Sequence, residues 1–173
     1  MRLFFALSFD SATKKRITPF RDWVIKEADK GQFTRDANYH LTLEFLGEIS
    51  DEKVPALIEI IHQLGPAPAE LRVNRIDAFE KRNKQILWLG IEHNHPLMTL
   101  QTQLIQRLQQ AGFETQDRPY RPHITLGRRI VLNKPLDAFQ FADFTIPVRA
   151  IALIESRPED DQVIYEAKLD SDV

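Results

Sequence analysis

The sequence predicts an α+β fold with antiparallel sheets, and three observations lead to that class. Apolar stretches of strand length alternate along the chain with amphipathic stretches of helix length. Two pairs of the strand-like stretches are joined by short polar turns, as in β-hairpins, whose strands pair antiparallel. No flexible linker or change of composition divides the chain, so we expect a single domain over residues 1–173.

The N-terminal stretch predicts a buried strand followed by a helix. Residues 3–9 alternate as a strand does, with four large apolar residues on one face: Leu3, Phe5, Leu7 and Phe9. This stretch is short for a secretion signal and lacks a small-residue cleavage site, so export is not expected. Residues 11–29 have helical spacing, but Pro19 requires either a kink or a helix that starts at Thr18.

The middle of the chain predicts a strand, a helix and a hairpin. Residues 40–46 form the strand, and Ser50 is expected to cap a helix that ends near residue 63. The strands of the hairpin lie at 70–79 and 85–91. Its basic turn is expected to be solvated, although it could also contact RNA phosphates. The turn sequence is Lys81-Arg82-Asn83-Lys84.

The last third of the chain predicts a helix, a strand and a second hairpin. Pro96 opens the helix, and Gly112 ends it. Residues 122–128 form a strand, and the closing hairpin has strands at 148–155 and 162–169.

The overall composition excludes several classes of function. The 173 residues include no cysteine, which excludes disulfides, thiolate metal sites and cysteine nucleophiles and suits a cytoplasmic location. The formal net charge is −2, whereas a protein that tracks along a nucleic-acid backbone usually carries a basic excess. Any contact with nucleic acid should therefore be local, as at a strand end. No apolar stretch approaches the roughly 20 residues that span a membrane.

One tetrapeptide recurs in the chain. His40-Leu41-Thr42-Leu43 is repeated as His123-Ile124-Thr125-Leu126. With five histidines present, the composition predicts only about 0.03 chance copies of His-x-Thr-Leu. On a strand, the first and third residues point to one face and the other two to the opposite face. Each copy therefore offers an imidazole and a hydroxyl on a strand whose other face is anchored in the core.

This pairing suits chemistry on a phosphate group. Thr hydroxyls and protonated imidazoles donate hydrogen bonds to anionic oxygens. Opening a cyclic phosphodiester needs a base that takes a proton from water and an acid that protonates the departing oxygen. Two histidines with pKa values near 6.5 can fill both roles without a metal ion, a cofactor or a covalent intermediate. A single His-x-Thr is more often an ordinary edge-strand feature, so the duplication is what favours catalysis.

The chain resembles the two-histidine (2H) phosphoesterases, and among them the RNA 2′,3′-cyclic phosphodiesterase branch, also described as 2′-5′ RNA ligase-like or LigT-like. Both tetrapeptides carry the resemblance, together with their flanks and three shorter stretches. These residues are 2–7, 38–47, 121–128, Glu155-Ser156 and Tyr165. The resemblance implies a bilobal fold in which two antiparallel sheets are related by a pseudo-twofold axis, with helices outside and a central cleft. It also implies hydrolysis of RNA 2′,3′-cyclic phosphate ends to 2′-phosphates. Reversible 2′-5′ joining, as of tRNA halves, is the weaker expectation.

The resemblance also suggests individual roles. His40 would be the proton donor and His123 the proton acceptor, an order that the nearly symmetric sequence cannot decide. Arg128 matches a basic residue that would bind phosphate, but strict strand alternation places it out of phase with the motif unless Gly127 breaks the alternation. The phosphate would also be bound by the motif threonines, Thr42 and Thr125.

Other polar and aromatic residues are weaker candidates. Tyr39, Tyr120 and Arg121 flank the motifs and could contact a base or the RNA, although the tyrosines could equally line the core. His93 and His95 resemble a metal pair, but no further ligand clusters with them, so a polar loop is expected. The implied partner is an RNA 3′ end that bears a 2′,3′-cyclic phosphate, bound by a monomer.

Two alternatives stay open. The same chemistry could serve a small cyclic nucleotide or an ADP-ribose cyclic phosphate, which the near-neutral charge also permits. The chain could instead be an RNA-end binding module, although binding alone does not need two imidazoles. Turnover of a cyclic-phosphate oligonucleotide would separate an enzyme from a binding module.

Overall fold

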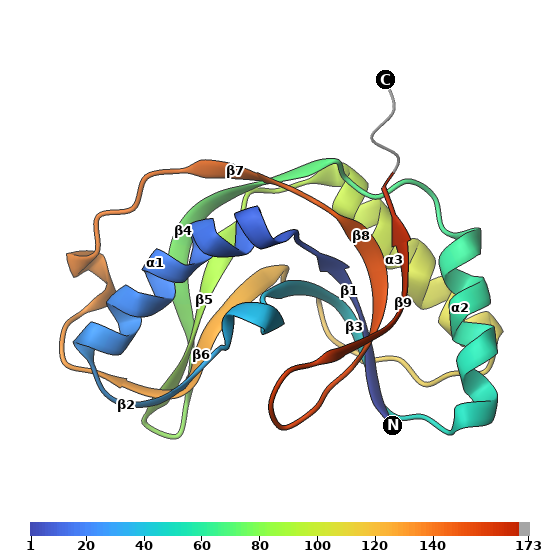
Figure 1. Ribbon diagram of the computed structural model, residues 1–173, viewed down its shortest axis with the longest axis horizontal. Helices are drawn as coiled ribbons and strands as arrows, with labels where there is room; N and C mark the ends of the chain where they lie inside the picture. The colour runs from blue at the N-terminus through green and yellow to red at the C-terminus, as the bar shows by residue number, and fades with distance from the viewer. Residues whose placement is uncertain (170–173) are drawn as a thin grey trace.

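The computed structural model describes residues 1–169, so the last four residues of the expected domain lie outside the described part. The strands are β1 (Arg2–Ser8), β2 (Ala28–Phe33), β3 (His40–Glu48), β4 (Glu70–Lys81), β5 (Lys84–Ile91), β6 (His123–Leu132), β7 (Phe144–Pro147), β8 (Ala150–Glu155) and β9 (Gln162–Lys168). The α-helices are α1 (Ser11–Glu27), α2 (Val54–Gln63) and α3 (His95–Gln110). The strands form a four-stranded sheet of order β3-β1-β8-β9 and a five-stranded sheet of order β2-β6-β5-β4-β7 (Figure 1). All pairings are antiparallel, which confirms the predicted α+β class.

The strands of the two sheets interleave along the chain, and two helices cross from one sheet to the other. Helix α1 follows β1 of the four-stranded sheet but packs against β2 and β6 of the five-stranded sheet (Figure 1). Helix α3 follows β5 of the five-stranded sheet but packs against β3, and α2 packs against β8 and β9. Buried apolar residues from both sheets and all three helices belong to one continuous core. None of the helices in residues 1–169 has the length and apolar composition of a membrane-spanning segment.

A unit of strand, helix and motif strand occurs twice. The first unit consists of β1, α1 and β3, and the second of β5, α3 and β6. In each unit the two strands pair with each other. His123 lies 83 residues after His40, and His95, where α3 begins, lies 84 residues after Ser11, where α1 begins. The repeated tetrapeptide is therefore part of a repeated supersecondary structure.

Helix α1 differs from the expectation in its bounds. It begins at Ser11, where the Asp10 side chain accepts a hydrogen bond from the Thr13 backbone N–H at 2.9 Å, so a start at Thr18 is wrong. Pro19 lies inside the helix and costs it a backbone donor. Ile17 and Val24, on either side of the proline, are fully buried, and this packing outweighs the local cost.

Two strands were not predicted, whereas seven of the nine that the described residues form lie where the sequence places them. The missed strands are β2 and β7. The helix predicted over residues 11–29 was also too long at its end, because β2 already begins at Ala28. Both missed strands are edge strands of the five-stranded sheet, and β2 has no buried residue. An edge strand without a buried face does not show the apolar alternation on which strand prediction depends. Strand β7 has one buried residue, Ile146, in only four residues, which is too short to show that alternation.

The local sequence explains the turn between β4 and β5 and the cap of α3, but not the start of α2. Arg82 and Asn83 have positive φ angles of 51° and 65°, as a two-residue hairpin turn between β4 and β5 requires. Asn94 caps α3 by accepting from the Leu97 N–H at 2.9 Å. Ser50 does not act as the expected side-chain cap, because a short 3₁₀ turn separates it from the start of α2.

Candidate active site

The two histidine motifs occupy equivalent places in the two sheets. His40 is the first residue of β3 and His123 the first residue of β6, and these two strands contact each other (Figure 1). The histidines and threonines of both motifs are half-buried. The intervening residues are at most 1% exposed, which confirms the predicted alternation: Leu41, Leu43, Ile124 and Leu126.

A β-bulge in β6 resolves the phase of Arg128. Thr125 and Gly127, on either side of Leu126, pair with two consecutive residues of β5. Leu126 therefore has no pairing partner in β5. A Cβ added to Gly127 would lie 3.0 Å from a side-chain carbon of the buried Ile130, so position 127 faces the core. Two successive residues thus face the core, and the next residue, Arg128, returns to the face of His123. The break in alternation that Gly127 could provide is therefore present.

Strand β3 has a bulge at the equivalent position. Thr42 and Glu44 flank Leu43 and pair with adjacent residues of β1, which leaves Leu43 without a partner. Phe45 is thereby brought to the face of His40 and pairs with Phe4 of β1. The bulge in β3 thus places Phe45 on the face of His40, and the bulge in β6 places Arg128 on the face of His123.

The environment of His40 strongly disfavours its charged form. Its pKa is lowered from 6.5 to about 4, chiefly by burial. The charges of Lys14, Arg128 and His123 lower the pKa further, whereas a hydrogen bond to the backbone of Asn38 raises it. Because charge on His123 and Arg128 acts on His40, these three groups from the two sheets share one electrostatic environment.

His123 has a similar environment. Burial lowers its pKa, and the charges of Arg128 and Arg118 act in the same direction. Nδ1 of His123 lies 2.6 Å from the carbonyl oxygen of Arg121, which can only accept, so Nδ1 carries a proton and Nε2 is left for a ligand. In both motifs the imidazole thus bonds to the backbone of the residue two positions earlier.

The flanking candidates have different environments. Tyr39 is 1% exposed and belongs to the core, which is the second of the two placements expected for it. Burial raises its pKa to about 12. The hydroxyl of Tyr120 donates to the Thr42 carbonyl oxygen at 2.7 Å, which links Tyr120 to β3 beside the first motif. The side chain of Arg121 is exposed.

Several residues near the imidazoles were not predicted. The Lys14 ammonium donates to the Ala37 carbonyl oxygen at 3.0 Å and comes from α1, whose sequence gives no sign of it. The ring centre of Phe4 lies 4.7 Å from that of His40, and the ring centre of Trp88 lies 5.7 Å from that of His123. Phe4 and Trp88 are 84 residues apart, which is also the separation between the starts of α1 and α3. Aligning the two repeated units in the sequence would therefore have identified this pair.

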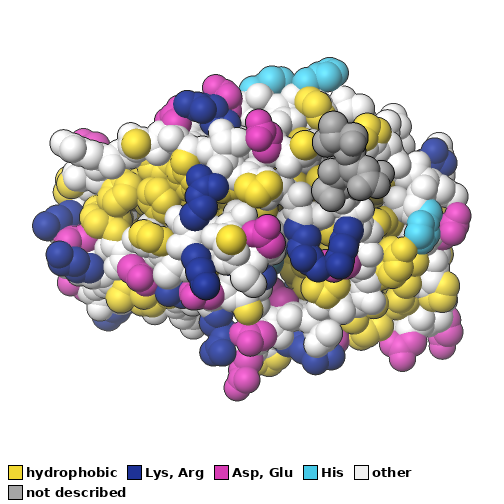
Figure 2. All heavy atoms as spheres, turned by 45° about the horizontal axis from the view of Figure 1, so that its top comes forward, with side chains coloured by type: hydrophobic (Ala, Val, Ile, Leu, Met, Phe, Trp, Pro, Cys, Tyr) yellow, Lys and Arg dark blue, Asp and Glu magenta, His cyan; other side chains and the backbone are white. Residues whose placement is uncertain are grey.

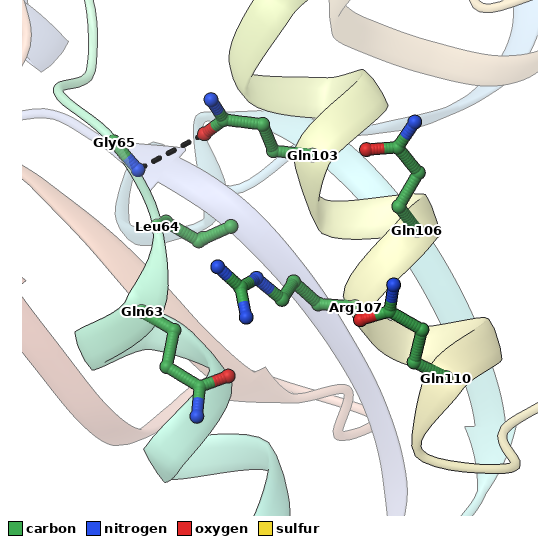
Figure 3. Close-up of a pocket in the computed structure, with 7 residues that line it drawn as sticks. All are labelled: Gln63, Leu64, Gly65, Gln103, Gln106, Arg107 and Gln110. Carbon is green, nitrogen blue, oxygen red and sulfur yellow. Dashed lines mark hydrogen bonds between the residues drawn. The ribbon is translucent and has the colours of Figure 1, made fainter.

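Other candidate sites are less complete. Among residues 1–169, no three His, Asp or Glu side chains are grouped so that they could hold a metal ion, and His93 and His95 lie at the exposed start of α3. A cavity of about 530 Å³ lies between α2 and α3 (Figure 3). Its polar lining has one cation, Arg107, and no histidine, and neither motif contributes to it.

The fold and the paired motifs define a class of α+β proteins in which each of two antiparallel sheets carries one His-x-Thr strand. The family model of the 2′-5′ RNA ligase superfamily matches residues 9–159, and the chain belongs to that superfamily. It is 27% identical to the RNA 2′,3′-cyclic phosphodiesterase of Methanocaldococcus jannaschii, over 96% of the chain and 97% of that protein.

Solved structures share the fold along the whole chain. The crystal structure of E. coli LigT complexed with 3′-AMP matches with a TM-score of 0.72 and 26% identity, covering 97% of each chain. The fold of TT0787 from Thermus thermophilus matches with a TM-score of 0.79 at 22% identity, covering 98% of each chain. The resemblance inferred from the two motifs is thereby confirmed.

Proposed function

We propose that this protein hydrolyses RNA 2′,3′-cyclic phosphate ends to 2′-phosphates, with His40 as the acid and His123 as the base. The observation that carries the proposal is that β3 and β6, which begin with His40 and His123, contact each other, so the two His-x-Thr motifs adjoin. The charge of Arg128 also lowers the pKa of both histidines. The names of relatives such as the Methanocaldococcus jannaschii protein support the substrate class, as does the binding of 3′-AMP to E. coli LigT.

In the proposed mechanism the threonines and Arg128 bind the phosphate oxygens. The Thr42 and Thr125 hydroxyls donate one hydrogen bond each, and the guanidinium stabilises the charge that develops in the transition state. A water molecule attacks phosphorus in line with the 3′ oxygen. As the new oxygen–phosphorus bond forms and the bond to the 3′ oxygen breaks, His123 takes the proton of water and His40 protonates the departing oxygen.

The lowered pKa values suggest how the acid becomes protonated. Both imidazoles are mainly neutral near pH 7 without ligand, because burial and Arg128 disfavour their charged forms. A bound phosphodiester brings a negative charge between them and favours one protonated imidazole. Substrate and proton therefore bind together, and the second imidazole stays neutral to act as the base.

Turnover of a short RNA with a 2′,3′-cyclic phosphate end tests the proposal. His40→Ala and His123→Ala should each lower kcat by about 10²–10⁴, the usual contribution of general acid or base catalysis. His62→Ala is a matched control, because His62 pairs with Tyr165 through a 2.9 Å hydrogen bond away from both motifs. Full activity in either motif variant would contradict the mechanism.

The same assay addresses the alternative substrates. The net charge of −2 is compatible with a small cyclic nucleotide or an ADP-ribose cyclic phosphate. A higher kcat/KM for the oligonucleotide than for a cyclic mononucleotide would support the RNA end as the substrate. The reverse order would favour the small-molecule alternative, and tight binding without turnover would favour an RNA-end binding module.

A further inference from the structure

The segment that leads into the first motif strand is held at both of its ends. Residues 34–38, which we call the entry segment, lie between β2 and β3 and end two residues before His40. The Thr34 N–H donates to the Leu126 carbonyl oxygen at 2.9 Å, so the entry segment begins beside the bulge of β6. Its last residue, Asn38, is hydrogen-bonded through its backbone to the His40 ring. The entry segment therefore connects the two motif strands.

Helix α1 holds the first part of the entry segment. The Arg21 guanidinium donates to the Thr34 carbonyl oxygen at 3.0 Å and pairs with the Asp36 carboxylate at 2.6 Å. The Lys14 ammonium donates to the Ala37 carbonyl oxygen at 3.0 Å. Both cations belong to the helix that packs against β2 and β6. These contacts all come from the side of the five-stranded sheet, which does not carry His40.

Asn38 is held from the other sheet, by the loop between β8 and β9. Its Nδ2 donates to the Glu159 carbonyl oxygen at 2.9 Å, and its Oδ1 accepts from the Asp161 N–H at 2.9 Å. The side-chain amide thus uses both its donor and its acceptor on one loop. A neighbouring ion pair, between Arg35 and Asp160 at 2.6 Å, joins two exposed side chains. Such an exposed pair contributes little by itself, so the amide is the stronger link.

The β8–β9 loop and the entry segment start from opposite ends of the four-stranded sheet. Glu155, the last residue of β8, pairs with Leu3 near the start of β1, whereas His40 pairs with Ser8 at the other end of β1. Figure 1 shows the loop curling toward the turn before β3, on the side away from α2 and α3. Those helices pack on the core face of this sheet, so the loop lies on the face that carries His40.

The second motif is built differently at the equivalent position. Arg121 lies two residues before His123, and its carbonyl oxygen is 2.6 Å from Nδ1 of the ring. The side chain of Arg121 is exposed, whereas Asn38 is half-buried against its loop. Both rings therefore receive a backbone hydrogen bond, but the residue that holds His40 is itself tied by its side chain to another part of the sheet.

We propose that Asn38 is a positioning residue for His40, whose side-chain amide fixes the backbone carbonyl to which the ring donates and thereby selects the tautomer of the ring. A carbonyl oxygen can only accept, so the ring nitrogen that faces it carries the proton and the other nitrogen is left for the substrate. The expected effect on turnover rests on the proposed function. The effect on the ring does not, because it is measured without any reaction.

Nitrogen-15 NMR of the His40 ring tests the proposal, because protonated and unprotonated ring nitrogens have different chemical shifts. Near pH 7, where the ring is neutral, the parent protein should show one tautomer. Asn38→Ala removes both hydrogen bonds to the loop and should give a mixture of the two tautomers. Asn38→Asp keeps the shape and the acceptor but loses the donor to the Glu159 carbonyl oxygen. It should also give a mixture, and it serves if Asn38→Ala does not fold.

The same variants should lose turnover in a particular way. Asn38 has no assigned contact with the phosphate, so its replacement should lower kcat for cyclic-phosphate RNA and leave KM nearly unchanged. Misplacement of a reacting group by about 1 Å can cost about 10²-fold, which sets the upper limit of the expected loss.

Two substitutions are matched controls for the NMR measurement. Arg35→Gln breaks the exposed ion pair between the same segment and the same loop, and it should retain the single tautomer of His40. Arg121→Ala removes the side chain at the equivalent position before the second motif. It should leave the tautomer of His123 unchanged, because only the backbone of Arg121 holds that ring.

A third control separates positioning from stability. Figure 2 shows hydrophobic side chains gathered over the end of the molecule where α1 and β7 lie. Phe141 belongs to an aromatic group there, 5.3 Å from Phe20 between ring centres. Phe141→Leu should lower the melting temperature without changing the tautomer of His40.

Two outcomes would overturn the positioning role: the single parental tautomer in both Asn38→Ala and Asn38→Asp, or a mixture of tautomers in Phe141→Leu. If His40→Ala still loses turnover in that case, the proposed function stands and only the role of Asn38 is lost. A mixture of tautomers in the Asn38 variants with an undiminished kcat would have the opposite meaning, since Asn38 would position a ring on which hydrolysis does not depend.

Discussion

Arg128 and His123 share one face of β6, although strict alternation would place residues five positions apart on opposite faces. The bulge at Leu126 inserts the extra residue, and Gly127 makes it tolerable next to the Ile130 side chain. The charge of this guanidinium lowers the pKa of both imidazoles.

Arg128→Ala should lower kcat for cyclic-phosphate RNA by about 10²–10³, the usual cost of removing a donor that stabilises transition-state charge. Arg128→Lys should recover part of the loss, because it restores the charge without the planar donor pair. Steady-state kinetics measure both. Arg129→Asn is the matched control, since Arg129 is exposed and has a φ of 52° that Asn tolerates. Near-parental activity of Arg128→Ala would contradict the assignment.

The motif threonines should contribute less than the histidines. Thr42→Val and Thr125→Val keep side-chain shape but remove one hydrogen bond each to a charged group, worth about 1.5–3 kcal/mol. We expect kcat/KM to fall by the corresponding factor, roughly 10- to 150-fold. Thr99→Val, at an exposed position of α3, should have no effect. A loss as large as that of the histidine variants would mean that the hydroxyls take part in proton transfer.

The pH profile should reflect the lowered pKa values. Catalysis needs one protonated and one neutral imidazole, and in the free protein both are neutral well above pH 6.5, whereas His40 is protonated only below about pH 4. The optimum of kcat/KM should therefore lie below pH 6.5. A bound phosphate raises both pKa values, so the kcat optimum should lie at higher pH. NMR titration of the His40 ring with and without 2′-AMP measures the shift directly, and an unliganded His40 midpoint above 6.5 would refute the account.

The sequence predicts most of the fold because most elements carry a periodic apolar face. It also identifies the imidazoles and hydroxyls, because their spacing matches strand geometry and recurs. The edge strands β2 and β7 were missed, because β2 has no buried face and β7 is too short to show such a period. The sequence left open whether Tyr39 lines the cleft or the core, because adjacency to a motif does not say which face of the chain a residue occupies just before a strand begins.

The sequence does not predict which side chains the pairing of the strands brings together. Phe79, Trp88 and Arg75 come together only through the register of β4, β5 and β6. Lys14, whose charge acts on His40 of the four-stranded sheet, belongs to a helix that packs on the five-stranded sheet. Such contacts join residues that are distant in the chain and follow no local pattern.

Catalysis should not depend on a metal ion. The two motifs supply an acid, a base and anion-binding groups from side chains alone, so turnover should persist in EDTA. Replacing His93 and His95 together with Ala should leave kcat within a few-fold of the parent. Loss of activity in chelator, restored by a divalent ion and abolished in the double variant, would instead assign a metal site at the start of α3.

The position of the phosphate in the product tests the central claim most directly. Hydrolysis of a short RNA with a 2′,3′-cyclic phosphate, followed by ³¹P NMR of the product, distinguishes a 2′-phosphate from a 3′-phosphate. With His40 as the acid for the 3′ oxygen and His123 as the base for water, we expect only the 2′-phosphate, and neither His40→Ala nor His123→Ala should form it at an appreciable rate. A 3′-phosphate product, or a 2′-phosphate formed equally fast by either variant, would contradict the mechanism.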